Sequence, residues 1–439
     1  MNTKFFKYII PALSLVFSVN FTSCLGDLDV TPIDPNLNVE FDQNANFAKI
    51  YAGLAITGNK GPDGQGDIAD TDEGASGLMR MLFNLNELPT DEAICAWSGD
   101  VDVYPLNFAK FTASNGVVLN MFNRLYIQIA QCNNFLIQTE GKDDEESLTQ
   151  RAEVRFIRAL DYYYLIDLYG NVPFVDENTG IGTYVPERIT RANLYTYIEK
   201  ELKEIEPQMK APRANVYGRA DQAAVWMLLS RLYLNAEVYT GDPQWNACIQ
   251  ECDDIINSGK YSLDINYSDP FKAHNENSLE NILVIPYDEI FATGFNYHLA
   301  ALHGANQKTY DLVGSPWGAG AYKGIPQFID TYDPDDERLN ATWLGGPQYA
   351  SDRTPLTGSY DLMGQPLIFV NKMPNGIFTG EAEGYRWLKY EVEMGARSEL
   401  NNDLVLFRLT QVHMMKAECL LRTGKADQAA SIVSMVRKR

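Results

Sequence analysis

Apolar residues recur at spacings of three and four along much of this chain, which is the pattern of helices that bury one face. Between residues 146 and 169, one such face is formed by Ala152, Phe156, Ala159, Tyr163 and Ile166. The same periodicity predicts a long helix over 118–139 and a shorter one over 191–207, and it begins near Ala45. We therefore expect a mainly helical protein.

Two segments have the pattern of a helix, a tight turn and a second helix. In 219–258 the turn is Gly241, Asp242 and Pro243, and 404–436 repeats the arrangement. Alanines at corresponding places in both segments would let the paired helices approach closely. This pattern is typical of tetratricopeptide-type hairpins, so we expect an alpha-alpha superhelix built from them.

Three regions of the chain differ in character. Residues 45–260 form an N-terminal helical region, 261–403 are rich in glycine and aromatic residues, and 404–439 hold the C-terminal hairpin. Within the middle region, 280–287 and 366–372 have the pattern of short strands. Loops carried by a rigid scaffold are the usual place for binding residues, so we expect the ligand at 261–403.

The last predicted helix is also the end of the sequence. Arg439 falls inside this helix, and no partner helix follows it. Because an amphipathic repeat cannot bury its apolar face alone, we expect the sequence to be truncated and the whole protein to be longer.

The N-terminus has the pattern of a lipoprotein signal peptide over residues 1–23. Lys4 and Lys7 precede an apolar run that is too short to span a bilayer, and small residues lead to Cys24. The thiol of Cys24 would receive the lipid, which attaches the protein to a membrane without crossing it. The polar segment 24–44 would be a tether. An ordinary secretory signal with an incidental cysteine is the alternative.

The charge of the chain narrows the class of ligand. Its 439 residues include 58 acidic and 36 basic side chains, for a net charge of −22. Such a surface repels phosphate backbones, so we expect no nucleic-acid partner. A neutral ligand such as a sugar would not be opposed.

The sequence predicts no metal, no cofactor and no catalytic residue. Cys248 and Cys252 lie one helical turn apart and are expected to be small core residues. The acidic loop 58–74 lacks the ligand spacing of a calcium-binding EF-hand. A nucleophile elbow, a zinc-protease motif and a Walker loop are all missing. We therefore expect a binding protein rather than an enzyme.

Four stretches together resemble the SusD-like (RagB/SusD) family of Bacteroidetes. They are the Cys24 motif, ELPTDEAICAW (87–97), RAEVRFIRALDYYYLIDLYGNVPF (151–174) and GRADQAAVWMLLSRLYLNAEVYTG (218–241). The resemblance runs to Arg439 and is strongest over 24–260. The chain departs from the family in a missing C-terminal portion and in a shorter, divergent 290–400 region.

The resemblance implies a fold and a cellular role. Four tetratricopeptide hairpins would pack against a loop-rich half that binds ligand. The protein would be a surface-exposed outer-membrane lipoprotein, lipid-anchored at Cys24. It would cap a SusC-like TonB-dependent transporter and capture polysaccharide or oligosaccharide for import.

A sugar ring has a polar rim and an apolar C–H face, so its site needs flat aromatic platforms and a few fixed polar groups. A starch-binding member of the family has an arc of two tryptophans and one tyrosine, and Trp97, Tyr297 and Trp317 match that arc. Arg80 and Asp100 match polar positions near it, where they would bond sugar hydroxyls. For each aromatic residue, the alternative is a ring packed inside the loop region.

The predicted function is therefore a cell-surface glycan-binding lipoprotein that serves nutrient uptake. Two alternatives from other classes stay open, a glycoside hydrolase and a tetratricopeptide scaffold that binds proteins. The sequence does not identify the glycan, because the curvature of the aromatic platform cannot be deduced from it.

Overall fold

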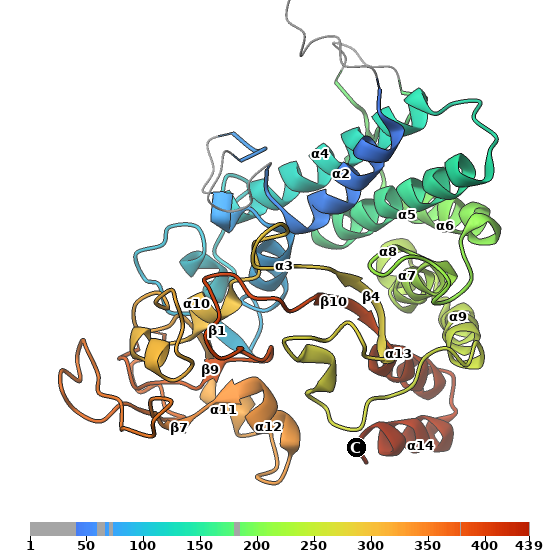
Figure 1. Ribbon diagram of the computed structural model, residues 1–439. Helices are drawn as coiled ribbons and strands as arrows, with labels where there is room; N and C mark the ends of the chain where they lie inside the picture. Colours follow the sequence, from blue (N-terminus) through green and yellow to red (C-terminus); the bar gives the residue numbers. More distant parts are fainter. Residues whose placement is uncertain (1–40, 59–65, 70–72, 180–184, 378, 439) are drawn as a thin grey trace, which may run out of the picture. The chain divides into compact units, whose positions relative to one another are not determined.

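The computed structural model describes residues 41–58, 66–69, 73–179, 185–377 and 379–438 (Figure 1). The elements from Gln43 to Arg439 belong to one compact unit. The predicted signal peptide, Cys24 and nearly all of the predicted tether lie outside the described residues, as does part of the acidic loop. Among the residues described, no helix combines the length and the apolar character that crossing a bilayer requires.

The N-terminal part of this unit is helical. Its helices are α2 (Gln43–Ala55), α3 (Leu78–Asn86), α4 (Gly116–Gln138), α5 (Glu145–Leu168) and α6 (Arg191–Ile205). The last three confirm the helices expected at 118–139, 146–169 and 191–207, with ends that differ by at most two residues. Helix α5 packs against both α4 and α6.

These three long helices begin where a polar side chain caps the first turn. The side chains of Asn115, Asp144 and Thr190 accept hydrogen bonds from backbone N–H groups that have no partner inside the helix. Each cap lies just before the apolar periodicity starts, which is why the predicted and observed starts agree.

A buried ion-pair network joins α4, α5 and α6. Arg158 on α5 is only 1% exposed, and its guanidinium donates to Glu201 Oε2 on α6 at 2.8 Å and to Asn133 Oδ1 on α4 at 2.7 Å. Arg155 donates to the other oxygen of Glu201 at 2.7 Å. Burial raises the pKa of Glu201, but its bonds to Arg155 and Arg158 bring that pKa below the ordinary value. The carboxylate therefore stays charged and fixes the spacing of the helices.

The first predicted hairpin is present, with a break in its first helix. It consists of α7 (Gln222–Leu234), the short α8 (Ala236–Thr240) and α9 (Trp245–Asn257). Gly241 ends α8 at a φ of +89°, which a residue with a side chain rarely adopts. Helix α9 packs along α7, and fully buried alanines in α7, such as Ala224, permit the close approach.

The prediction of the second hairpin is confirmed for its two helices and wrong for residues 404–408. Helices α13 (Leu409–Arg422) and α14 (Ala426–Val436) form the pair, but Leu404–Arg408 is a strand, β10. It runs antiparallel to β4 (Asn281–Ile285), with Leu404 opposite Ile285. No local pattern reveals this strand, because its backbone partner lies more than a hundred residues away. Helix α13 packs against α9, which places the two hairpins side by side (Figure 1).

The middle region contains few and short strands, as expected. One sheet has the order β1-β5-β9-β6, formed by Ala93–Cys95, Tyr322–Gly324, Arg386–Trp387 and Trp343–Leu344. The predicted strand at 280–287 is confirmed by β4. That at 366–372 is reduced to β8 (Ile368–Phe369), which pairs with β7 (Gly346–Pro347), and a further pair joins β2 (Val172–Pro173) to β3 (Arg188–Ile189).

Short helical turns complete the loop-rich part. The α-helical ones are α10 (Tyr297–Ala301), α11 (Pro326–Ile329) and α12 (Glu337–Thr342). The 3₁₀ turns are η3 (Glu73–Ala75), η4 (Tyr104–Phe108), η5 (Glu206–Gln208), η6 (Asp269–Phe271) and η7 (Gly304–Lys308). Of the residues described, therefore, the helices form the scaffold, and the chain between α9 and β10 is mostly loop.

The Arg158 network is expected to contribute to the free energy of unfolding. Glu201→Ala removes the carboxylate that faces Arg158 and Arg155, so we expect a loss of about 3 kcal/mol in the free energy of unfolding. Urea denaturation measures this. Lys200→Ala, whose side chain is 71% exposed on the same helix, is the control and should change stability by less than about 0.5 kcal/mol. Equal effects of the two substitutions would contradict the role of the network.

Candidate functional site

Two tryptophans that are far apart in sequence meet at the sheet of the loop-rich part. Strand β1 ends at Cys95, and Ala96 donates a backbone hydrogen bond to the carbonyl of Ala321, just before β5. This pairing places Trp97 next to the loop that carries Trp317. The ring centroids are 6.0 Å apart, and the ring planes make an angle of 44°. Trp97 is half-buried, and Trp317 is 36% exposed.

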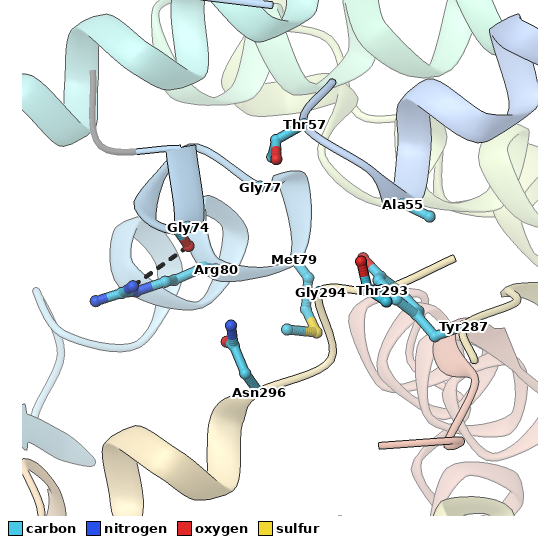
Figure 2. A pocket seen from close by; sticks show the side chains of 10 residues that line it. All are labelled: Ala55, Thr57, Gly74, Gly77, Met79, Arg80, Tyr287, Thr293, Gly294 and Asn296. Carbon is cyan, nitrogen blue, oxygen red and sulfur yellow. Dashed lines mark hydrogen bonds between the residues drawn. The ribbon is translucent and has the colours of Figure 1, made fainter. Parts of the chain in front are cut away.

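Arg80 lies against both rings. It comes from α3, and its guanidinium carbon is 5.6 Å from the Trp97 centroid and 5.5 Å from the Trp317 centroid. These distances are within the range of cation–π attraction. Figure 2 shows that its Nη1 also donates to the carbonyl oxygen of Gly74, at 3.3 Å. The structure thus brings three of the five predicted site residues together.

The pocket behind Arg80 is too small for a sugar. It is enclosed by residues from α2, α3 and the 287–296 loop, including Met79, Tyr287 and Asn296 (Figure 2). Its cavity volume is about 10 Å³, which is room for roughly one water molecule. Any sugar ring at this site would therefore lie on the tryptophan surface.

Asp100 has a structural task in the turn after Trp97. Its Oδ1 accepts hydrogen bonds from the backbone N–H groups of Asp102, at 2.9 Å, and Val103, at 2.8 Å. Its own N–H donates to the carbonyl of Trp97 at 3.0 Å. Asp100 therefore fixes the turn that carries Trp97. Its predicted bond to a sugar hydroxyl stays a prediction.

Tyr297 does not share the surface of the tryptophans. It is 7% exposed, and its hydroxyl donates to the carbonyl of Met79 at 2.7 Å. Its ring packs against Trp387, Phe83 and Phe295, with centroid distances of 4.8, 5.4 and 5.7 Å. These contacts support the alternative given for this residue, a ring packed inside the loop region. The sequence could not separate the two because spacing along a loop does not reveal which side chain points inward.

One exposed aromatic residue beside Trp317 was not predicted. Tyr360 is 54% exposed, and its hydroxyl lies 3.8 Å from the position that a Cβ on Gly318 would occupy. Its ring meets that of His303 edge to face, with centroids 5.8 Å apart. Glycines on both sides of Tyr360, as around Trp317, mark it in the sequence as a loop residue, but they do not indicate which way its ring points.

Two buried basic side chains hold loops of this region in place. Arg386 is fully buried and donates to the carbonyls of Ala319, at 3.2 Å, and Glu383, at 2.9 Å. Lys323 is 1% exposed, and its Nζ donates to Thr379 Oγ1 at 2.7 Å and to the Gly380 carbonyl at 3.0 Å. Burial, reinforced by the nearby Arg386, lowers the pKa of Lys323 to about 6. Burial also lowers the pKa of Arg386, to about 9.

The cysteines of the hairpins lie in the core. Cys248 and Cys252 on α9 are fully buried, as is Cys419 on the adjacent α13. The thiol of Cys252 contacts Ser230 Oγ at 3.6 Å. Within the parts of the chain that the structure describes, no three His, Cys, Asp or Glu side chains converge in a way that would hold a metal ion.

Fold and site together define a class of protein: a helical-hairpin scaffold that carries an aromatic surface on its loops. Two family models match this chain. Residues 28–234 match a SusD-like family described as starch-binding and associating with the outer membrane, and residues 257–439 match the SusD family. The chain belongs to the SusD-like family, which confirms the resemblance found in its sequence.

Curated relatives agree with this assignment. Starch-binding protein SusD of Bacteroides thetaiotaomicron is 44% identical over 288 residues, which are 65% of this chain and 52% of that protein. SusD-like protein P25 of Formosa agariphila is 23% identical over 365 residues, 76% of this chain and 65% of that protein. The chain thus spans about half the length of the starch-binding relative.

Solved structures share the fold. Surface glycan-binding protein A of Bacteroides thetaiotaomicron, in complex with laminarihexaose, aligns with a TM-score of 0.67 at 19% identity, over 90% of this chain and 82% of that one. A laminarin-binding SusD-like protein aligns with a TM-score of 0.63 at 16% identity, over 87% and 80% of the two chains. The expected mainly helical, tetratricopeptide-type fold is confirmed. The first of these proteins is named for glycan binding and the second for laminarin binding.

The depressed pKa of Lys323 makes stability depend on pH. Between about pH 6 and the ordinary lysine value, the unfolded chain binds a proton that the folded chain does not, so stability rises with pH in this window. One such group changes the free energy of unfolding by up to about 1.4 kcal/mol per pH unit. We expect Lys323→Met to lose roughly 3 kcal/mol of the rise between pH 7 and 9, because that interval spans two pH units.

Urea denaturation at the two pH values measures this difference. Lys200→Met, at an exposed position, is the matched control and should follow the pH dependence of the wild type. Parallel pH dependence in wild type and Lys323→Met would show that Lys323 is charged in the folded protein.

Proposed function

We propose that this chain captures a neutral polysaccharide or oligosaccharide at a bacterial surface and does not cleave it. The observation that carries the proposal is the pair of tryptophans, Trp97 and Trp317, with Arg80 against both rings. The C–H faces of sugar rings stack on exposed aromatic rings, and the guanidinium N–H groups suit the hydroxyls at the rim. The net charge of −22 does not oppose such a ligand.

An α-glucan is the first ligand to test. The support is the 44% identity to a protein named as starch-binding, which is well above the identity to the laminarin-binding structures. Laminarin, a β-glucan, is the second. The open, tilted arrangement of the two rings fits a chain that lies across the surface, since the adjoining pocket holds only about one water molecule.

Family membership and the residue pattern of the N-terminus support a proposal for the cellular setting. We propose that Cys24 carries the lipid anchor and that the protein works with a SusC-like TonB-dependent transporter, to which it delivers captured glycan. The family model is described as associating with the outer membrane, which supports this location. A pure protein-binding scaffold is the main competing function, because paired helices such as α7 and α9 commonly bind peptides.

Affinity gel electrophoresis of the purified chain separates these functions. We expect gels that contain soluble starch to retard it, and we expect no release of reducing sugar on prolonged incubation. Release of sugar would support a hydrolase, and migration unaffected by starch, laminarin and other soluble polysaccharides would support the scaffold.

Single substitutions test the tryptophan surface. Trp97→Ala and Trp317→Ala should each weaken binding of soluble starch about tenfold or more, equivalent to roughly 1.4 kcal/mol, because each removes a stacking platform. Isothermal titration calorimetry measures the affinity.

Two controls accompany these variants. Trp245→Ala removes a half-buried tryptophan of α9, and Tyr297→Phe removes only the hydroxyl bond to Met79. Both should leave the affinity unchanged, while Tyr297→Phe should lower stability by about 1 kcal/mol. Unchanged affinity in the Trp97 and Trp317 variants would place the site elsewhere.

A further inference from the structure

We propose that Tyr360 is an additional ligand platform, which extends the binding surface past Gly318 so that the site favours long oligosaccharides over disaccharides. The inference rests on the proposed function and adds to it the length of the ligand. It also assigns a task to the buried carboxylate of Glu381, which positions Tyr360 without touching the ligand.

Tyr360 lies close to the loop that carries Trp317. Its hydroxyl is 3.8 Å from the position that a Cβ on Gly318, the next residue after Trp317, would occupy. Trp317 is 36% exposed and Tyr360 is 54% exposed, so two open aromatic rings flank Gly318. Trp97, whose ring centroid lies 6.0 Å from that of Trp317, is the third aromatic residue of this group.

The second step is the anchoring of the Tyr360 backbone. The Glu381 side chain is fully buried, and its carboxylate accepts hydrogen bonds from the N–H groups of Ser359, at 2.8 Å, Tyr360, at 3.1 Å, and Leu362. In return, the N–H of Glu381 donates to Asp361 Oδ1 at 2.9 Å. Bonds from several backbone N–H groups to one ionised carboxylate are strong, so this turn is held in one conformation.

Burial raises the pKa of Glu381, but its bonds with Ser359, Leu362, His303 and Tyr360 bring that pKa below the ordinary value. The glycine before the turn is part of the arrangement. A Cβ on Gly358 would come within 2.5 Å of Glu381 Oε1, so a side chain there would push the carboxylate away.

His303 connects the anchor to the Trp317 loop. Its Nδ1 accepts a hydrogen bond from the N–H of Ala305 at 3.0 Å, so its proton is on Nε2, which donates to Glu381 Oε2 at 2.9 Å. The next residue, Gly304, donates its N–H to the carbonyl of Gly318 at 2.8 Å. Hydrogen bonds on either side of the His303–Gly304 peptide bond thus link the backbone of Tyr360 to Gly318, the residue beside Trp317.

The hydrogen bonds that fix its backbone distinguish Tyr360 from a surface tyrosine on an unrestrained loop. A ring that is ordered before binding loses little conformational freedom when a ligand stacks on it, which favours affinity. Fully burying the Glu381 carboxylate is costly in free energy, and its hydrogen bonds offset that cost. The same bonds hold the turn that presents Tyr360. A short sugar that covers Trp97 and Trp317 would leave Tyr360 uncovered, whereas a longer one would reach it.

Chain length therefore provides the test. Isothermal titration calorimetry would use maltose and maltoheptaose as probes, with laminarihexaose as a second series. We expect Tyr360→Ala to weaken maltoheptaose binding about three- to tenfold and to leave maltose binding unchanged. Tyr360→Phe, which keeps the ring, should bind like the wild type. Phe291→Ala removes an exposed ring that lines a different cavity and should also bind like the wild type.

A double-mutant cycle tests Glu381 as a positioning residue. Glu381→Gln should reproduce the loss for maltoheptaose alone, and Tyr360→Ala with Glu381→Gln should be no weaker than Tyr360→Ala. A merely structural role would instead weaken both probes and add to the Tyr360 effect. Melting curves identify any variant that fails to fold. In that case, the affinities of Tyr360→Phe and Tyr360→Leu for maltoheptaose are compared instead.

The outcomes separate the two proposals. Unchanged maltoheptaose binding by Tyr360→Ala, or an equal loss for both probes, would overturn the extended platform while the tryptophan site stands. Wild-type protein whose migration is unaffected by starch, laminarin and other soluble polysaccharides would overturn the proposed function itself and this inference with it.

Discussion

The Glu381 carboxylate, buried and bonded to three backbone N–H groups and to His303, represents the constraint on which the loop-rich part of this protein depends. A chain with little helix or sheet must still satisfy its buried backbone polar groups. Here buried side chains bond to backbone groups that a helix or sheet would otherwise pair. Arg386 donates to the carbonyls of Ala319 and Glu383, and Asn402 donates to those of Phe271, Lys272 and Glu391. In these three cases, a buried polar side chain holds the backbone of a loop in place.

In the helical scaffold, regular secondary structure satisfies the buried backbone polar groups. Its backbone groups pair within α4, α5 and α6, and capping side chains complete the first turns. Its buried Arg158 and Glu201 bond to each other between α5 and α6. The antiparallel pair β4–β10 joins the two regimes, because it links the loop-rich segment to the start of α13. Glu280, next to β4, reinforces the junction by accepting a bond from Arg408 at 3.1 Å.

The surface at Trp97 and Trp317 depends on both regimes. Trp97 follows a strand whose neighbour, β5, is preceded by the Trp317 loop, and Arg80 comes from a scaffold helix that packs against α4. Rings and guanidinium are thus contributed by three separate segments. Such a surface offers flat apolar rings on which the proposed sugar ligand would stack. This agrees with membership in a family whose relatives are named for starch or glycan binding.

The sequence by itself determined the helices, because their periodicity, caps and terminal glycines act within a few residues of one another. It also indicated the family, and with it Trp97, Trp317 and Arg80 as candidate site residues, which the structure places side by side. Tertiary structure alone decided three things. Leu404–Arg408 became a strand because its partner lies far away in the chain. Tyr297 was packed inside, and Tyr360 was left exposed. The physical reason is common to all three: in segments without periodicity, the side of the chain that faces inward is set by long-range backbone bonds, and these leave no local pattern in the residues.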